Sequence, residues 1–404
     1  MIFQKYKESL LKLAFFLMFI LLLFPSNIKP LVIGFFAVIV INFIYFERLK
    51  FDVKYFIING AIYLLLILSL IYTDDIAYSF KKFESMASLL IFPFLFSFLS
   101  RFPLKIYKNI DRFLFYFILS VALLNITFFL MIWLGEEAAF KNVIKHYVFL
   151  IDNNILNNYN IHPIYMSIDV CLAIIFCMYL ITNKTSAKFT SLLILILGVL
   201  FFFLFILSKK GPIISLALVT VVYFFIKTEM KYKIFFLLSM VVFFFVIFSS
   251  QTSKDHFYEI LNVKDIRKGE ITSSNIRYTI YKCSFDLFKK EPLLGYGVGD
   301  ANNELIKSYK DISSKLFYDR YNSHNQYLSF LLRIGLIGLI LILASFFFLF
   351  SKGIKNSNYL FLMVFSFYLL EMFTENILER QDGVIFYSFF VSLLQVYNKS
   401  KIET

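Results

Sequence analysis

Cysteine is scarce in this sequence, and several common metal and hydrolase motifs are missing. Three cysteines exclude a disulfide framework. No cysteine and histidine residues have the spacing of a metal site, and neither HExxH nor GxSxG occurs. There is no Asp-x-Asp motif of the kind that holds a divalent metal against a diphosphate, and Asp74-Asp75 is the nearest approach. We therefore predict no metal and no cofactor, with Arg and Lys serving any phosphate chemistry.

Charge is also scarce, because only 17% of the residues are charged while 60% are hydrophobic. A soluble domain cannot bury that much apolar surface. Apolar runs of roughly 17–25 residues fit a hydrocarbon layer about 30 Å thick. The sequence therefore predicts an all-α polytopic membrane protein, with a single integral membrane domain over 1–404. About twelve transmembrane helices are expected, at 10–24, 30–46, 55–72, 85–99, 113–134, 163–181, 191–207, 212–226, 234–248, 328–350, 359–373 and 384–396.

The net charge of +13 does not indicate nucleic-acid binding, because most Lys and Arg lie in short loops between apolar runs. These loop residues gather on the cytoplasmic side when both termini are cytoplasmic, as the positive-inside rule requires. The same topology puts the two longest loops, 135–162 and 249–327, outside the cytoplasm. All four histidines lie in these loops. We therefore expect any chemistry at the extracytoplasmic face.

The later of these outer loops is expected to be large and helical. Arg277 and Tyr281 lie on one face of a predicted helix within it. Gly295, Gly297 and Gly299 follow at alternating positions, where they allow positive φ angles and the close approach of another group. A turn that folds the loop back onto the membrane is the simpler interpretation of these glycines. They lack the Gly-Lys-Ser/Thr ending of a phosphate-binding loop.

The same loop ends in a candidate general base. His324 lies between Asn322 and Asn325, directly before a predicted span. A neutral imidazole can take a proton from a hydroxyl group near neutral pH. A histidine that only forms hydrogen bonds at the membrane boundary is the alternative. His162, at the start of an earlier span, either has a structural role or lines the same cavity.

Two groups of charged residues lie outside the large loop. Lys209 and Lys210 form an outer turn, which anion binding or simple hydration explains equally well. Late in the chain, Arg380 follows three acidic residues at i, i+4 spacing, which are expected to share one helical face: Glu371, Glu375 and Glu379. Charged groups at membrane depth either pair within the protein or face a polar cavity.

Together these motifs resemble the O-antigen ligase and O-antigen polymerase family of bacterial membrane glycosyltransferases. The resemblance covers the arrangement of the spans, with one large outer loop late in the sequence. Its residue-level part comprises Arg277-x-x-x-Tyr281, Pro292-Leu-Leu-Gly295-Tyr-Gly297-Val-Gly299, His324-Asn325, Lys209-Lys210-Gly211 and Asn376-Ile-Leu-Glu379-Arg380-Gln381-x-Gly383. The sequence departs from the family at Lys210, where Arg is more usual, and at Tyr281, where Trp is common.

The resemblance implies metal-independent transfer of a glycan from undecaprenyl diphosphate to an acceptor hydroxyl, such as one on lipid A-core. The reaction would take place at the outer, periplasmic face of the bacterial inner membrane and would invert the anomeric carbon. His324 would be the base, and Arg277 would help to neutralise the diphosphate. The remaining candidates would bind substrate: Lys209, Lys210, Arg380, Asn322, Asn325, His162, Tyr281, Gly295, Gly297 and Gly299.

Three other interpretations stay open. A repeat-unit polymerase of the same family would use the same chemistry with another acceptor. A lipid-linked glycan transporter or flippase would account for the acidic groups at membrane depth. A structural membrane subunit would need no chemistry, but it does not explain why every histidine is expected on one side.

Overall fold

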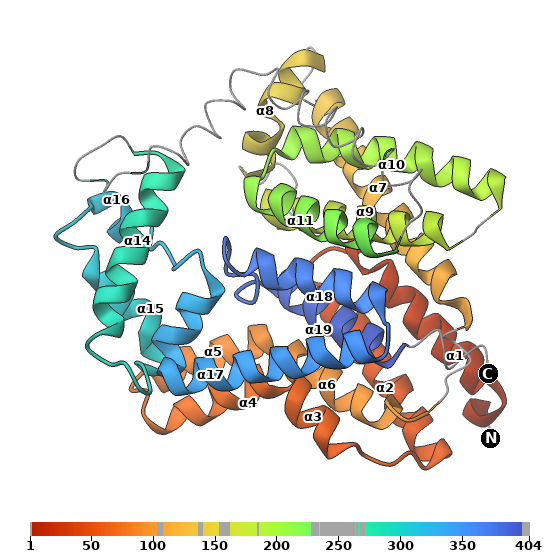
Figure 1. Ribbon diagram of the computed structural model, residues 1–404, viewed down its shortest axis with the longest axis horizontal. Coiled ribbons are helices and arrows are strands. Elements are labelled where there is room, and N and C mark those ends of the chain that lie inside the picture. The colour runs from red at the N-terminus through yellow and green to blue at the C-terminus, as the bar shows by residue number, and fades with distance from the viewer. Residues whose placement is uncertain are drawn as a thin grey trace. The chain divides into compact units, whose positions relative to one another are not determined.

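The computed structural model describes residues 2–102, 108–135, 140–152, 162–183, 186–227, 234, 263, 266 and 271–397 (Figure 1). The regular elements in this described part are all helices, which confirms the predicted all-α class. The chain forms two compact units. One comprises Met1–Phe51, Phe98–Ile234 and Tyr397–Thr404, and the other comprises Asp52–Ser97 and Phe235–Val396.

The first unit is built around one helix that is apolar on all sides. This helix, α9 (Pro163–Thr182), is buried along most of its length, as expected of a segment without a polar face. It packs mainly against α7 (Ile110–Gly135), α10 (Ala187–Leu207) and α11 (Lys210–Lys227). The remaining helices of this unit are α1 (Ile2–Phe19), η1 (Leu21–Leu23), α2 (Lys29–Glu47) and α8 (Phe140–Asp152).

The second unit is built around α17 (Gln326–Lys355), which lies beside α3 (Val53–Asn59) and α4 (Ala61–Leu68) from early in the chain (Figure 1). It also contacts α14 (Ser273–Phe288) and α15 (Gly297–Ser308). The other elements of this unit are η2 (Ser69–Ile71), α5 (Ile76–Met86), α6 (Ser88–Leu99), α16 (Ser314–Tyr318), α18 (Tyr359–Glu371) and α19 (Gln381–Val396).

The central helix α17 is interrupted at Gly335, whose φ of 62° and ψ of −167° are not helical. The loop before α15 fills the break, because Tyr296 N donates to Leu332 O at 2.7 Å and Leu336 N donates to Pro292 O at 2.9 Å. A Cβ atom on Gly335 would lie 2.1 Å from Leu293 O. Only glycine can therefore occupy this position without displacing the loop.

Five helices in the described residues are long and apolar enough to cross a membrane: α2, α7, α9, α10 and α17. The number becomes seven if the bent pairs Val53–Asn59 with Ala61–Ile71 and Ile76–Met86 with Ser88–Leu99 each count as one span. The predicted twelve are therefore not confirmed. The predicted spans at 212–226, 359–373 and 384–396 form shorter apolar helices, and the span at 234–248 lies outside the described residues except for 234.

The predicted outer loop at 249–327 is described at 263, 266 and 271–327, where it contains α14, α15 and α16. These helices pack together around buried Ile280, Leu305 and Tyr309. The loop therefore has an apolar core of its own, while the side of the membrane on which it lies stays a prediction.

Candidate active site

The segment before α17 holds His324 in an unusual backbone conformation, with φ at 42°. Its two asparagine neighbours explain how this conformation is maintained. Asn322 Oδ1 accepts a hydrogen bond from His324 N at 3.0 Å, and Asn325 caps α17 by accepting from Tyr327 N and Leu328 N at 3.0 and 3.1 Å. Both asparagines were predicted to bind substrate, and in the structure their amide oxygens orient the backbone around the histidine.

His324 faces a buried carboxylate that the sequence did not single out as its partner. His324 Nδ1 lies 3.2 Å from Glu375 Oε2. The other carboxylate oxygen accepts a hydrogen bond from Asn376 N at 3.2 Å. Burial raises the pKa of Glu375, but the hydrogen bond to His324, the charge of His324 and the charge of Arg277 lower this pKa below its usual value.

The contact with Glu375 determines which imidazole nitrogen carries the proton when His324 is neutral. An ionised carboxylate can only accept hydrogen bonds, so Nδ1 must donate to Glu375. The second ring nitrogen, Nε2, is then left with its lone pair. This is the arrangement that a general base needs.

Helix α14 brings Tyr281 to the backbone of His324 and places the charge of Arg277 near Glu375. The two residues are one helical turn apart, on the face that the sequence predicted. The Tyr281 hydroxyl lies 3.3 Å from His324 O and 3.2 Å from Phe373 O, and the Arg277 charge lowers the pKa of Glu375. The structure therefore brings together His324, Arg277 and Tyr281, which were identified from two separate motifs.

The three glutamates do not share one helical face, because α18 ends at Glu371 and the next helix begins at Gln381. The connecting segment instead forms hydrogen bonds to the first residue of α17. Gln326 N donates to Met372 O at 2.8 Å, and Gln326 Oε1 accepts from Leu378 N at 3.0 Å. These bonds to another helix replace the helical continuation that the i, i+4 spacing predicted.

Glu379, in the same segment, is the centre of a buried ion network. Its carboxylate lies 2.5 Å from Arg333 Nη2 and 2.6 Å from Lys82 Nζ. Burial alone would raise the pKa of Glu379, but the charges of Arg333 and Lys82 lower it to about 2. The network ties α5 and α17 to the segment that carries Glu375. Sequence reasoning missed it, although a charged residue inside a predicted span, such as Arg333, was a signal for a buried partner.

The glycine series brings α15 into close contact with the protein's own backbone. Gly297 has φ at 84°, and a Cβ atom there would lie 2.5 Å from the side chain of Thr73. On Gly299 it would lie 2.3 Å from Asp75 O, and on Gly295 it would lie 2.5 Å from Leu332 O. The glycines therefore allow the start of α15 to dock closely on these neighbours, and their substrate-binding role stays a prediction.

Asp300, which follows the glycines, completes this docking. Its carboxylate accepts hydrogen bonds from Thr73 Oγ1, Asp74 N and Asp75 N at 2.8, 2.6 and 3.2 Å. In return, Gly299 N donates to Thr73 Oγ1 at 3.0 Å. The early segment that precedes α5 and the late helix α15 are thus held by reciprocal bonds.

Four further residues were predicted to bind substrate. Arg380 is exposed and follows Glu379, whose side chain is 8% exposed. His162, Lys209 and Lys210 belong to the first unit. There His162 caps α9, because its Nδ1 accepts from Ile164 N at 3.3 Å, and Lys210 begins α11. Their roles at one shared site stay predictions.

Comparison with known protein families gives one match to a family model. The family is described as O-antigen ligase, and residues 171–343 are matched. The match includes Arg277, Tyr281 and His324 and ends before Glu375 and Glu379. A search of curated proteins found no match. The family match confirms the resemblance inferred from the sequence motifs.

Proposed function

We propose, from the match of residues 171–343 to the O-antigen ligase family, that the chain is a membrane glycosyltransferase. It moves a glycan from undecaprenyl diphosphate to an acceptor hydroxyl, such as one on lipid A-core, at the periplasmic face of the inner membrane. The observation that carries this proposal is the hydrogen bond between His324 Nδ1 and Glu375, with the Arg277 charge acting on the same carboxylate.

In the proposed reaction, His324 Nε2 removes the proton from the acceptor hydroxyl as its oxygen attacks the anomeric carbon of the donor. The bond from that carbon to the diphosphate oxygen breaks, and the diphosphate leaves with the electron pair. The imidazolium that forms is stabilised by the Glu375 carboxylate. Attack from the side opposite the leaving group inverts the anomeric carbon.

Arg277 supplies the positive charge that the departing diphosphate requires. A guanidinium group can offer two parallel N–H donors to phosphate oxygens. Its charge also lowers the pKa of Glu375, the carboxylate beside the base. Arg277 thus neutralises the departing diphosphate next to the acid–base pair. Lys210 and Arg380 are the further cations proposed to contact the diphosphate.

The test is transfer by membranes that contain His324→Ala or Arg277→Ala, with a lipid-linked glycan as donor. We expect each variant to lower the transfer rate by roughly 10²- to 10⁴-fold, the usual range for losing an acid–base or charge-stabilising group. Lys289→Ala is the matched control, because this exposed lysine pairs with Asp286 on the surface of α14. Full activity in both site variants would contradict the mechanism.

The acceptor distinguishes a ligase from a polymerase, and we favour the ligase because the matching family is described as O-antigen ligase. A strain that lacks the protein is expected to accumulate lipid-linked polymer with no attached product. Attached single repeat units without longer ladders would instead indicate a polymerase. Movement of the donor across vesicles with no covalent product would indicate a transporter.

A further inference from the structure

The turn between α14 and α15 exposes two apolar side chains. Leu293 is 60% exposed and Leu294 is 51% exposed. A single exposed leucine is common on protein surfaces, so the meaning of this pair depends on what lies beside it.

The nearest neighbours of the turn on α17 are also apolar and exposed. Leu336 and Ile337 begin the part of α17 that follows the Gly335 break. They lie against the turn, because Leu336 N donates to Pro292 O at 2.9 Å and Ile337 N donates to Leu293 O at 3.3 Å. The apolar surface of the turn therefore continues onto the helix.

A third segment reaches the same place from early in the chain. Ile71, at the end of η2, is exposed. The next residue, Tyr72, is bonded to the turn, because its hydroxyl donates to Leu294 O at 2.8 Å. An exposed apolar patch built from several segments is typical of an interaction surface. We call this patch the apolar rim, and it comprises Ile71, Leu293, Leu294, Leu336 and Ile337.

The backbone of the turn meets the condition for lying in an apolar environment. Bilayer hydrocarbon offers no hydrogen bonds, so backbone groups at that depth must be paired within the protein. The carbonyls of Pro292 and Leu293 accept from α17, and the carbonyl of Leu294 accepts from Tyr72. The carbonyls of the turn are thus paired within the second unit, while its two leucine side chains stay exposed.

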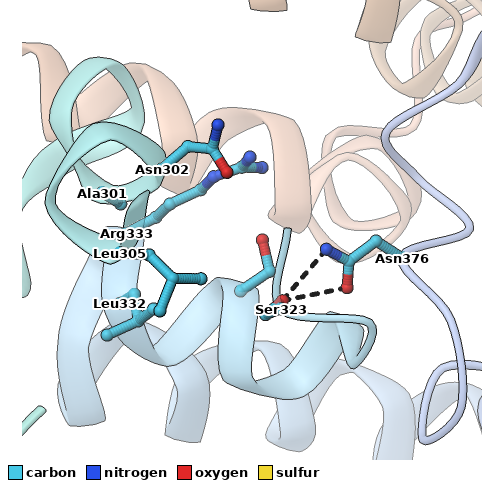
Figure 2. A pocket seen from close by; sticks show the side chains of 8 residues that line it. Ala301, Asn302, Leu305, Ser323, Leu332, Arg333 and Asn376 are labelled. Atoms are coloured by element: carbon cyan, nitrogen blue, oxygen red, sulfur yellow. Dashed lines mark hydrogen bonds between the residues drawn. The ribbon is translucent and has the colours of Figure 1, made fainter. Parts of the chain in front are cut away.

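The pattern of α17 indicates what covers the rim. The stretch 334–351 has no charged residue, and its length of roughly 27 Å, at about 1.5 Å per residue, matches a hydrocarbon layer about 30 Å thick. Before the break, Arg333 is buried and lies beside the amide of Asn302 from α15 (Figure 2). After the break, buried residues recur every three or four positions, which leaves the other faces of the helix exposed. These buried residues are Gly338, Ile342, Phe346, Leu349 and Gly353.

We propose that the Gly335 break lies at the edge of the hydrocarbon layer, and that the apolar rim inserts there among the acyl chains of membrane lipids. The rim continues the exposed face of α17, which is long and apolar enough to cross a membrane. Lys289 and Lys290 precede the turn and are exposed, where long basic side chains can reach the lipid headgroups. The large loop thus has a membrane anchor, which fixes the depth of α14 and of Arg277 on it.

The test places a fluorescent probe in the turn and asks whether lipid or water reaches it. The sequence has one tryptophan, Trp133, so Leu293→Trp in a Trp133→Phe background gives a single emitter. The full-length protein is reconstituted in phosphatidylcholine vesicles whose acyl chains are brominated near the headgroup end. We expect these lipids to quench most of the Leu293→Trp fluorescence, and aqueous iodide to quench little of it. Leu294→Trp repeats the measurement, which keeps the test decisive if one variant fails to fold.

Two control positions bracket the expected result. Phe347, further along α17, is 75% exposed, and Phe347→Trp should be quenched by lipid alone. Tyr318, on α16, is 77% exposed and is followed by the charged Asp319 and Arg320, so Tyr318→Trp should be quenched by iodide alone. Quenching of Leu293→Trp and Leu294→Trp by iodide alone, as for Tyr318→Trp, would overturn the proposal.

Other occupants of the rim give other results, and each would also overturn the proposal. Protection from both iodide and brominated lipid would indicate that a second copy of this chain or another protein covers the rim. Loss of lipid quenching when undecaprenyl diphosphate is added would assign the rim to the isoprenoid chain of the donor. The vesicles otherwise contain neither donor nor acceptor, so failure of the proposed transfer mechanism would leave the quenching result unchanged.

Discussion

Replacing Glu379 with glutamine tests the buried ion network most directly. The glutamine side chain has nearly the same shape but no charge, so Arg333 and Lys82 would stay in place without a counter-charge. Removing one partner of a buried ion pair costs roughly 3–5 kcal/mol, because the remaining charge is buried and unbalanced. We therefore expect Glu379→Gln to be strongly destabilising at neutral pH.

The lowered pKa gives an independent estimate of the same quantity. A fall of the Glu379 pKa from 4.5 to about 2 corresponds to roughly 3 kcal/mol of folding free energy at neutral pH. Because the folded pKa is depressed, this contribution is fully present above pH 4.5 and is lost as the pH falls through about 2. The two estimates agree in direction and in size.

The assay is the thermal midpoint of the purified protein in detergent at a series of pH values. A loss of roughly 3–5 kcal/mol lowers the midpoint by roughly 6–20 °C in a unit of 150–250 residues. Glu304→Gln is the control, because Glu304 pairs with Lys307 on the surface of α15, and such pairs contribute about 0–1 kcal/mol. Equal midpoints for Glu379→Gln and the unmodified protein at pH 7, or a gap that persists unchanged into acid, would refute this reasoning.

Three further changes have defined outcomes. Glu375→Gln should lower transfer at neutral pH, because the amide has no charge to stabilise the imidazolium that forms on His324; an unchanged rate in the variant would contradict the role of the carboxylate. Gly335→Ala should lower the thermal midpoint, since its Cβ would lie 2.1 Å from Leu293 O and a strained residue costs roughly 1–3 kcal/mol. Gly34→Ala, with nothing within 4 Å, serves as its control and should be neutral or stabilising. Asp300→Asn should cost roughly 1–3 kcal/mol by weakening three hydrogen bonds, whereas Asp286→Asn on the exposed face of α14 should change the midpoint little.

Much of the helical pattern could be predicted from the sequence, because apolar runs and their caps are local signals. The predicted span at 163–181 corresponds to α9 at Pro163–Thr182, and the one at 191–207 corresponds to α10 at Ala187–Leu207. Breaks within the predicted spans were harder to predict. The span at 55–72 bends by 71° between α3 and α4. Asn59-Gly60 lies at the bend and is a turn signal, but the apolar run around it predicted a continuous span.

The candidate site was predictable as a set of separate motifs but not as a network. His324 and Arg277 were identified from residue chemistry and a family resemblance, and the structure brings both to Glu375. The pairing itself depends on where the chain turns after Glu371. That turn is determined by bonds to Gln326, a residue far away in the sequence. The local spacing of the glutamates predicted a continuous helix, because a hydrogen bond to a distant residue leaves no pattern in the neighbouring sequence.

The contact between Lys82 and Glu379 also has a consequence for the order of synthesis, since 297 positions separate the two residues. At a translation rate of roughly 5–20 residues per second, Lys82 leaves the ribosome roughly 15–60 s before its carboxylate partner exists. During that interval α5 carries an ammonium group that has yet to meet its counter-ion, so it must remain hydrated or be shielded by an insertion factor. The second unit can therefore close only after nearly the whole chain has been made.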